Sequence, residues 1–287
     1  MKMAKTIGNP ISWAARNLGA ASDHVSDSVS QLGSADTKHL PMVQTLTVQD
    51  LRACLRAGYH DFVETRADAI FIVLIYPIAG LLMFGFAMQA NMVPLLAPLV
   101  AGFALIGPVA ALGLYEISRK REQGHEVHWL DALGVFRSPS FGAILALAFY
   151  LVMLLLVWLM VAHGIYVETL GPQPPETLSQ FLTRALTTGP GWTMIIVGSA
   201  VGFLFALVAL AVSVVSFPLL LDRKVGLPVA VVTSVRVLRH NPTVILTWGF
   251  IVAALLVLGA IPLLLGLIVA MPVLGHATWH LYRRAIA

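Results

Sequence analysis

Long apolar blocks separated by short polar segments dominate the chain after about residue 66. Blocks of 18 or more apolar residues with few charges are typical of transmembrane helices. They cover about 67–89, 93–115, 141–166, 192–221, 243–260 and 262–282. The last two form one run that is too long for a single crossing at about 1.5 Å per residue, and "GAIP" (259–262) divides it. The pattern therefore predicts an all-α, polytopic membrane helix bundle with six transmembrane helices.

A short amphipathic segment precedes each pair of apolar blocks. The three segments are "LRACLRAGYHDF" (51–62), "WLDALGVFRSPS" (129–140) and "VAVVTSVRVLRHNP" (229–242). Thr47 and Asp50 resemble a capping box at the start of the first. Segments of this kind suit helices that lie in the headgroup plane. We therefore expect three hairpins of transmembrane helices, each preceded by a short cytoplasmic interfacial helix.

The distribution of basic residues indicates the orientation. Residues 1–45 are rich in Ser and poor in large apolar periodicity, which predicts a disordered cytoplasmic tail, and residues 46–287 then form the membrane domain. With both termini on one side, that side carries seventeen of the 18 Lys and Arg residues, and the other side carries only Arg184. Because cytoplasmic segments are enriched in Lys and Arg, we expect a bacterial inner-membrane protein with both termini in the cytoplasm.

Composition agrees with this class and excludes several functions. Hydrophobic residues make up 58% of the chain and charged residues 11%, against about 25% charged in soluble domains. Basic residues sit at the ends of apolar blocks, not in a stripe, so nucleic acid is not an expected partner, whereas the lipid bilayer is. The single cysteine, Cys54, leaves no intramolecular disulfide or CxxC site. No charged residue lies in the middle of a block, which argues against a pump or a proton-coupled transporter.

Small residues recur every four positions in two of the blocks. They are Gly107 and Ala111 in the second block, and Gly198, Gly202 and Ala206 in the fourth. This spacing lets helix backbones approach closely, so we interpret these residues as helix-packing positions.

The last block ends in "LGHATWHLYRR", which allows two interpretations. His276 and His280 share one helix face, and a metal or haem site at the membrane surface would use them, with Met271 as an additional thioether ligand. Alternatively, Trp279, Tyr282, Arg283 and Arg284 form the aromatic and basic anchor of a helix that leaves the membrane. We favour the anchor and expect no cofactor, with a metal or haem as the alternative.

Three segments resemble a family of bacterial, largely proteobacterial, integral membrane proteins catalogued as a domain of unknown function. They are "PLVAGFALIGPVAALGLYEISRKREQG", "RHNP" and "MPVLGHATWHLYR". Some members carry a label related to cytochrome c oxidase subunit I, but the catalytic subunit would need intramembrane histidines that this chain lacks.

The chain contains no nucleophile elbow, phosphate-binding loop, HExxH or CxxC, so we do not expect an enzyme. The first functional hypothesis is a non-enzymatic scaffold or an assembly or accessory factor, near respiratory complexes as the resemblance implies. The alternative is a transporter or permease for a neutral or amphipathic solute. A metal- or haem-binding protein is the second alternative.

Overall fold

The computed structural model describes residues 40–287, apart from 90–91, 174, 176 and 263. The prediction of a disordered tail therefore lies outside the described residues as far as residue 39. The described part is helical and holds no strand, with one isolated bridge between Val43 and Ile286. This confirms the all-α class.

The first helix, α2 (Val48–Gln89), begins at the predicted capping box. Thr47 N donates to Asp50 Oδ2 over 2.8 Å, and Asp50 N donates back to Thr47 Oγ1 over 3.3 Å. The interfacial helix and the first apolar block were predicted as separate helices, but α2 is assigned as one helix through both. No Gly or Pro stands between Gly58 and Pro77, so the polar residues there do not end the helix.

The second apolar block is divided by a break. The short 3₁₀ helix η2 (Val93–Leu95) leads into α3 (Leu96–Ala110), and α4 (Leu112–Glu122) follows after Ala111. Pro108 lies inside α3, where it has no N–H to donate to the helical ladder. The predicted single helix over 93–115 is therefore wrong in its boundaries.

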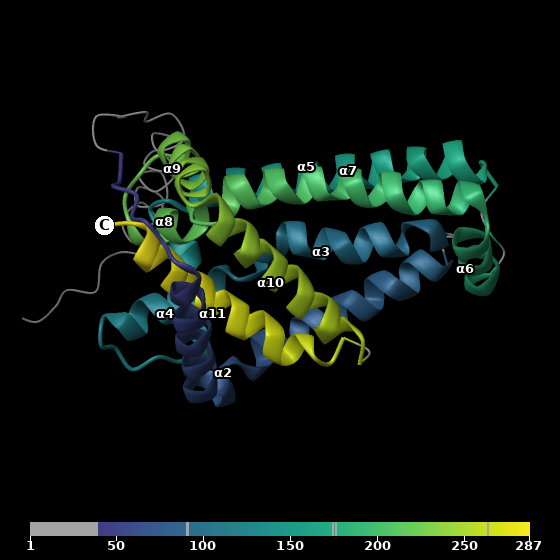
Figure 1. Cartoon of the computed structure of the whole chain (residues 1–287). Helices are drawn as coiled ribbons and strands as arrows, with labels where there is room; N and C mark the ends of the chain where they lie inside the picture. The colour runs from purple at the N-terminus through teal and green to yellow at the C-terminus, as the bar shows by residue number, and fades with distance from the viewer. Residues whose placement is uncertain (1–39, 90–91, 174, 176, 263) are drawn as a thin grey trace, which may run out of the picture.

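The next helices build the long part of the molecule. The 3₁₀ helix η3 (Trp129–Arg137) takes the place of the second predicted interfacial helix. α5 (Phe141–Leu170), α6 (Leu178–Thr187), α7 (Gly189–Ser213) and α8 (Ser216–Asp222) follow. α5 and α7 run alongside α3, and α6 lies across one end (Figure 1). A two-residue turn at Val214 and Val215 separates α7 from α8, but Gly189–Asp222 still counts as one candidate span, in agreement with the fourth predicted block.

The last helices are α9 (Leu227–His240), α10 (Pro242–Ala260) and α11 (Leu267–Ala285). α9 stands where a helix was predicted before the last pair, and the predicted break near "GAIP" is present between α10 and α11. Among the described residues, the five largest fully buried side chains lie on α4, α8, α10 and α11; they are Tyr115, Phe217, Trp248, Trp279 and Tyr282.

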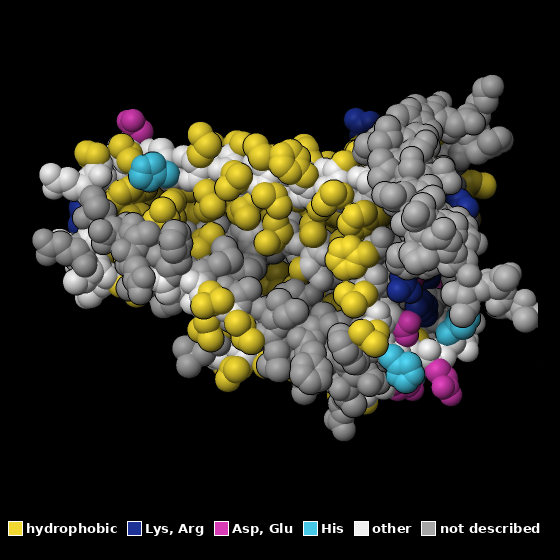
Figure 2. All heavy atoms as spheres, turned by 180° about the vertical axis from the view of Figure 1, so that it is seen from behind, with side chains coloured by type: hydrophobic (Ala, Val, Ile, Leu, Met, Phe, Trp, Pro, Cys, Tyr) yellow, Lys and Arg dark blue, Asp and Glu magenta, His cyan; other side chains and the backbone are white. Residues whose placement is uncertain are grey.

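Three helices in the described part are long and apolar enough to cross a membrane: Phe141–Leu170, Gly189–Asp222 and Pro242–Ala260. A helix pair bent by 45°, Val93–Gly102 and Ala104–Ala110, makes a fourth if it counts as one crossing. Hydrophobic side chains cover the long face seen in Figure 2, whereas charged side chains and histidines lie toward its ends. This distribution suits helices surrounded by lipid.

The beginning of the described chain and its C terminus lie together. Gln44 N donates to Ala285 O over 2.9 Å, and Ala287 N donates to Met42 O over 3.2 Å. Residues 40–45 were assigned to the disordered tail, but here they form an extended segment held by the C-terminal residues. Their backbone groups have partners that only the folded chain supplies.

Candidate functional site

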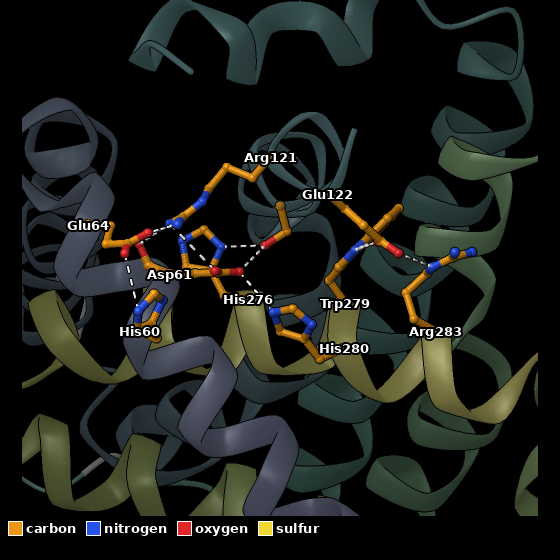
Figure 3. Close-up of polar contacts among 10 residues, drawn as sticks. His60, Asp61, Glu64, Arg121, Glu122, His276, Trp279, His280 and Arg283 are labelled. Carbon is orange, nitrogen blue, oxygen red and sulfur yellow. Dashed lines mark hydrogen bonds and ion pairs between the residues drawn. The ribbon is translucent and has the colours of Figure 1, made fainter. Parts of the chain in front are cut away.

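A polar cluster joins α2, α4 and α11 at the end of the bundle that carries most of the charges (Figure 3). Asp61 on α2 lies at its centre. Its Oδ2 atom accepts a hydrogen bond from Ser118 Oγ on α4 at 3.1 Å and lies 2.9 Å from His280 Nε2 on α11. Ser118 Oγ is also 2.7 Å from His276 Nδ1. Three helices that are distant in sequence therefore meet at one carboxylate.

Local sequence explains why these helices approach so closely. Gly58 lies one turn before Asp61, and a Cβ atom added at Gly58 would stand 2.5 Å from the backbone nitrogen of Ala277. Only glycine leaves space for α11 at this point. Since His276 and His280 are four residues apart, both lie on the face of α11 that α2 meets.

The hydrogen bonds determine which nitrogen of His276 carries the proton. A carboxylate only accepts, so the Ser118 hydroxyl proton points to Asp61. His276 Nδ1 is then the donor to Ser118 Oγ, and His276 Nε2 keeps a bare lone pair. His276 is 0% exposed, and its Nε2 atom has no hydrogen-bond partner in the described part of the chain.

Charged groups surround Asp61 on its other side. Arg121 Nη1 lies 3.5 Å from Asp61 Oδ1, and the same guanidinium pairs with Glu64, which also lies 3.2 Å from His60 Nε2. Burial alone would raise the pKa of Asp61, but the hydrogen bond from His280 and the nearby His276, His280 and Arg121 together hold this pKa below its ordinary value. Asp61 is therefore a carboxylate at neutral pH.

The remaining residues of the terminal motif bind carboxylates from other helices. Trp279 Nε1 donates to Glu122 Oε2 over 3.0 Å, and Arg283 Nε donates to Glu122 Oε1 over 2.9 Å. Tyr282 Oη donates to Asp222 Oδ2 over 2.6 Å. Trp279 and Tyr282 are 1% and 0% exposed. The aromatic anchor was expected at the lipid surface, but these two rings face the protein interior.

Arg284 and Glu116 take part in further ion pairs at this end. Arg284 Nη1 lies 2.6 Å from Asp50 Oδ1, which links the end of α11 to the start of α2. Glu116 is buried and pairs with Arg119 at 2.7 Å. The first pair therefore joins two helices, whereas the second lies within α4.

Metal chemistry finds little support in this geometry. Among the residues that the structure describes, no group of three or more His, Cys, Asp or Glu side chains could hold a metal ion. His280 Nε2 and His276 Nδ1 face Asp61 and Ser118 instead of a common centre. Met271 lines a cavity on another side of α11, so it does not join the histidines.

The small residues predicted for packing have different surroundings. A Cβ atom at Gly202 would meet the Trp158 ring at 3.0 Å, as expected for a packing position. At Gly107 and Gly198, no atom of the described part of the chain lies within 4 Å of an added Cβ. Gly107, Ala111 and Ala206 line an apolar cavity of about 330 Å³ between α3, α7, α10 and α11. At these three positions, small side chains leave space between helices.

Several residues of this site were not predicted from the sequence. These residues come from three different helices, and each forms its hydrogen bond with a side chain far away in the sequence. They are Asp61, Ser118, Glu122 and Asp222. One local pattern does point to the site: a glycine one turn before a carboxylate, as in Gly58 and Asp61, followed by an apolar block.

The match to a protein family concerns the centre of the chain, from α3 to α8. Residues 95–222 match the family described as "Predicted integral membrane protein (DUF2189)". This is a domain of unknown function, in agreement with the predicted resemblance and with the apolar helices. No curated protein and no solved structure matches the chain. Ser118 and Glu122 lie inside the matched region, whereas Asp61, His276 and His280 lie outside it.

Proposed function

We propose that this chain is a non-enzymatic scaffold or accessory protein of the bacterial inner membrane, with six transmembrane helices. One observation carries the proposal: the polar groups at one end of the bundle are used to join helices. Asp61 links α2, α4 and α11, and Glu122 and Asp222 bind side chains of α11. Such a layer stabilises a fixed arrangement of helices and leaves their outer faces for contacts.

The number of crossings is supported by the position of the chain ends. Because residues 42–44 pair with residues 285–287, both lie at the same end of the bundle, which requires an even number of crossings. The apolar part of α2 and the first turns of α11 would complete six together with the four candidate spans. The excess of Lys and Arg at this end favours the cytoplasm.

The orientation can be tested by cysteine labelling, but the native thiol is a poor probe. Cys54 is 0% exposed, and burial raises its pKa to about 11. Two single-cysteine variants, Glu126→Cys and Glu168→Cys, are made in a Cys54→Ala background. Glu126 lies in the segment before η3 and Glu168 lies near the C-terminal end of α5, and both residues are exposed. In intact cells an impermeant maleimide should label the second variant only. Labelling of the first would reverse the proposed orientation.

The outer faces of α5 and α7 are the surfaces proposed for membrane protein partners. Phe149 and Met160 on α5 and Phe203 on α7 are exposed, at 65%, 73% and 60%. We propose contacts with membrane proteins such as respiratory complexes. A photoreactive residue at Met160 or Phe203 should crosslink one membrane protein reproducibly in native membranes, while the same residue at Glu126 should not. Products containing lipid alone would contradict a scaffold role.

The apolar cavity favours a second candidate, a transporter or permease for a neutral or amphipathic solute. The cavity is large enough for an apolar chain, and Gly107 lines it with no atom of the described residues within 4 Å of an added Cβ. Uptake of a fluorescent single-chain amphiphile into proteoliposomes should then decrease in the Gly107→Leu variant. It should persist in the Gly198→Leu control, because Gly198 lies outside the cavity and likewise has space for a side chain among the described residues. If wild-type proteoliposomes took up no more probe than empty vesicles, transport of this amphiphile would be excluded and the scaffold function would be favoured.

A further inference from the structure

A basic recess lies where α9 meets the first described segment of the chain. It has a volume of about 400 Å³, and the described residues that line it are Met42, Val43, Arg236, Arg239 and His240. No carboxylate is among these residues. The recess is separate from the Asp61 cluster and from the apolar cavity, and neither proposed function uses it.

Hydrogen bonds, one of them buried, connect the walls of this recess. Asn241 is 4% exposed; its Oδ1 accepts from Leu46 N at 2.7 Å, and its Nδ2 donates to Gln44 O over 3.0 Å. His240 Nε2 lies 3.1 Å from Thr45 Oγ1. The C-terminal residues fix the other edge of the segment, through Ala287 and Met42. Several hydrogen bonds therefore join the extended segment to the C-terminal end of α9.

The two arginines of the recess differ from others at this end of the molecule. Arg119, Arg121, Arg283 and Arg284 each pair with a carboxylate. Arg236 and Arg239 are exposed and lie three residues apart on one face of α9. Two adjacent guanidinium groups that face solvent provide the planar donors that a phosphate oxygen accepts.

The position of α9 indicates where that phosphate comes from. α10, which is long and apolar enough to cross a membrane, begins at Pro242, two residues after His240. The recess must then lie at the level of the lipid headgroups. Val232, one turn before Arg236, is 45% exposed and extends the same face of α9 with an apolar side chain. A cationic recess beside an apolar contact matches the two parts of a phospholipid.

We propose that this recess binds the phosphate-bearing headgroup of an anionic phospholipid, with Arg236 and Arg239 as the main ligands and His240 at the rim. The proposal depends on α10 as a transmembrane helix, and it does not depend on a scaffold or transport activity. Basic pockets at the ends of transmembrane helices recognise lipid headgroups in this way.

The test compares two double variants of the full-length chain purified in mild detergent. Arg236→Ala/Arg239→Ala removes the proposed ligands, and Arg52→Ala/Arg56→Ala removes two exposed arginines from α2 as the charge-matched control. Each protein is titrated with phosphatidylglycerol, phosphatidylcholine or inorganic phosphate, and bound lipid is counted by native mass spectrometry. Far-ultraviolet circular dichroism and the unfolding temperature without lipid confirm that each variant is folded.

We expect phosphatidylglycerol to bind the wild type and the control equally. The affinity for phosphatidylglycerol should fall about tenfold or more in Arg236→Ala/Arg239→Ala. Each arginine near a lipid surface increases the binding constant on the order of fivefold. An equal loss in both variants would show general surface attraction and overturn the site. Binding of inorganic phosphate as tight as that of the lipid would overturn the lipid assignment and identify a free-anion site.

Discussion

At the scale of single residues, the Asp61 cluster shows how a hydroxyl can couple a carboxylate to a buried imidazole. Ser118 accepts from His276 Nδ1 and donates to Asp61, so each side chain depends on the next for its partner. A buried polar group that loses its partner costs more than the hydrogen bond contributes. The cluster is therefore a place where small substitutions have large effects on stability.

Ser118→Ala should destabilise the protein by about 1–3 kcal/mol, because His276 would then be buried with neither nitrogen bonded. Thr278→Ala is the matched control, since Thr278 Oγ1 only donates back to Leu274 O within α11. Thermal or denaturant unfolding in detergent measures the difference. Equal stability of the two variants would mean that the hydrogen bonds of the Ser118 hydroxyl do not stabilise the folded protein.

Asp61 should also make stability depend on acid pH. Its pKa in the folded protein lies below the ordinary value of 3.8, so the carboxylate stabilises the folded state. This contribution is complete above about pH 4 and is lost as the pH falls through the folded pKa. Asp50 and Asp131 have lowered pKa values as well, so the informative quantity is the difference between wild type and Asp61→Asn. That difference should shrink as unfolding is measured from pH 7 toward pH 3.

At the scale of helices, the packing of α2 on α11 depends on a single missing side chain. A Cβ atom at Gly58 would lie 2.5 Å from Ala277 N and 2.7 Å from Val273 O, and backbone atoms cannot rotate away. Elsewhere on α2, a Cβ atom at Gly85 would meet no atom of the described residues within 4 Å. The same substitution at these two glycines therefore has opposite consequences.

Gly58→Ala should destabilise the protein by about 1–3 kcal/mol, because α11 must move away and the Asp61 contacts stretch. Gly85→Ala should be neutral or stabilise by up to about 1 kcal/mol, since alanine favours the helix and has space. Unfolding temperatures of the two variants give the comparison. If Gly58→Ala were as stable as Gly85→Ala, the close contact of α2 and α11 would be wrong.

At the scale of the whole molecule, Asn241 joins the first described segment of the chain to the junction of α9 and α10. Its side chain bonds both Leu46 N and Gln44 O, and the same segment pairs with the C-terminal residues. A short extended segment without a sheet has few other partners for its backbone. The joint therefore depends on one buried amide.

Asn241→Ala should release residues 42–46, at a cost of about 1–3 kcal/mol, because Leu46 N would remain buried without a partner. Thr45→Ala, which removes only the exposed bond to His240, is the control. Hydrogen exchange of residues 42–46 and of 285–287 should increase together in the first variant and stay slow in the second. Exchange confined to residues 42–46 would show that the C terminus is held independently.

The sequence alone determined the class of this protein, because hydrophobic periodicity and the shortage of charges are properties of the local chain. Apolar runs such as 141–166 and 243–260 predicted α5 and α10 closely, and the capping box of Thr47 and Asp50 placed the start of α2. The pair Glu116–Arg119 could also be expected, since both residues stand on one helix face.

Only the tertiary structure decided what the individual residues do. The spacing of His276 and His280 allowed a metal pair, and Trp279 and Tyr282 resembled a lipid anchor, but their partners are carboxylates and a hydroxyl from helices up to 219 positions away. Likewise, Gly107 and Gly202 have the same local pattern, yet one lines a cavity and the other packs against Trp158. Burial and pairing depend on contacts that close large loops of chain, and local periodicity carries no information about them.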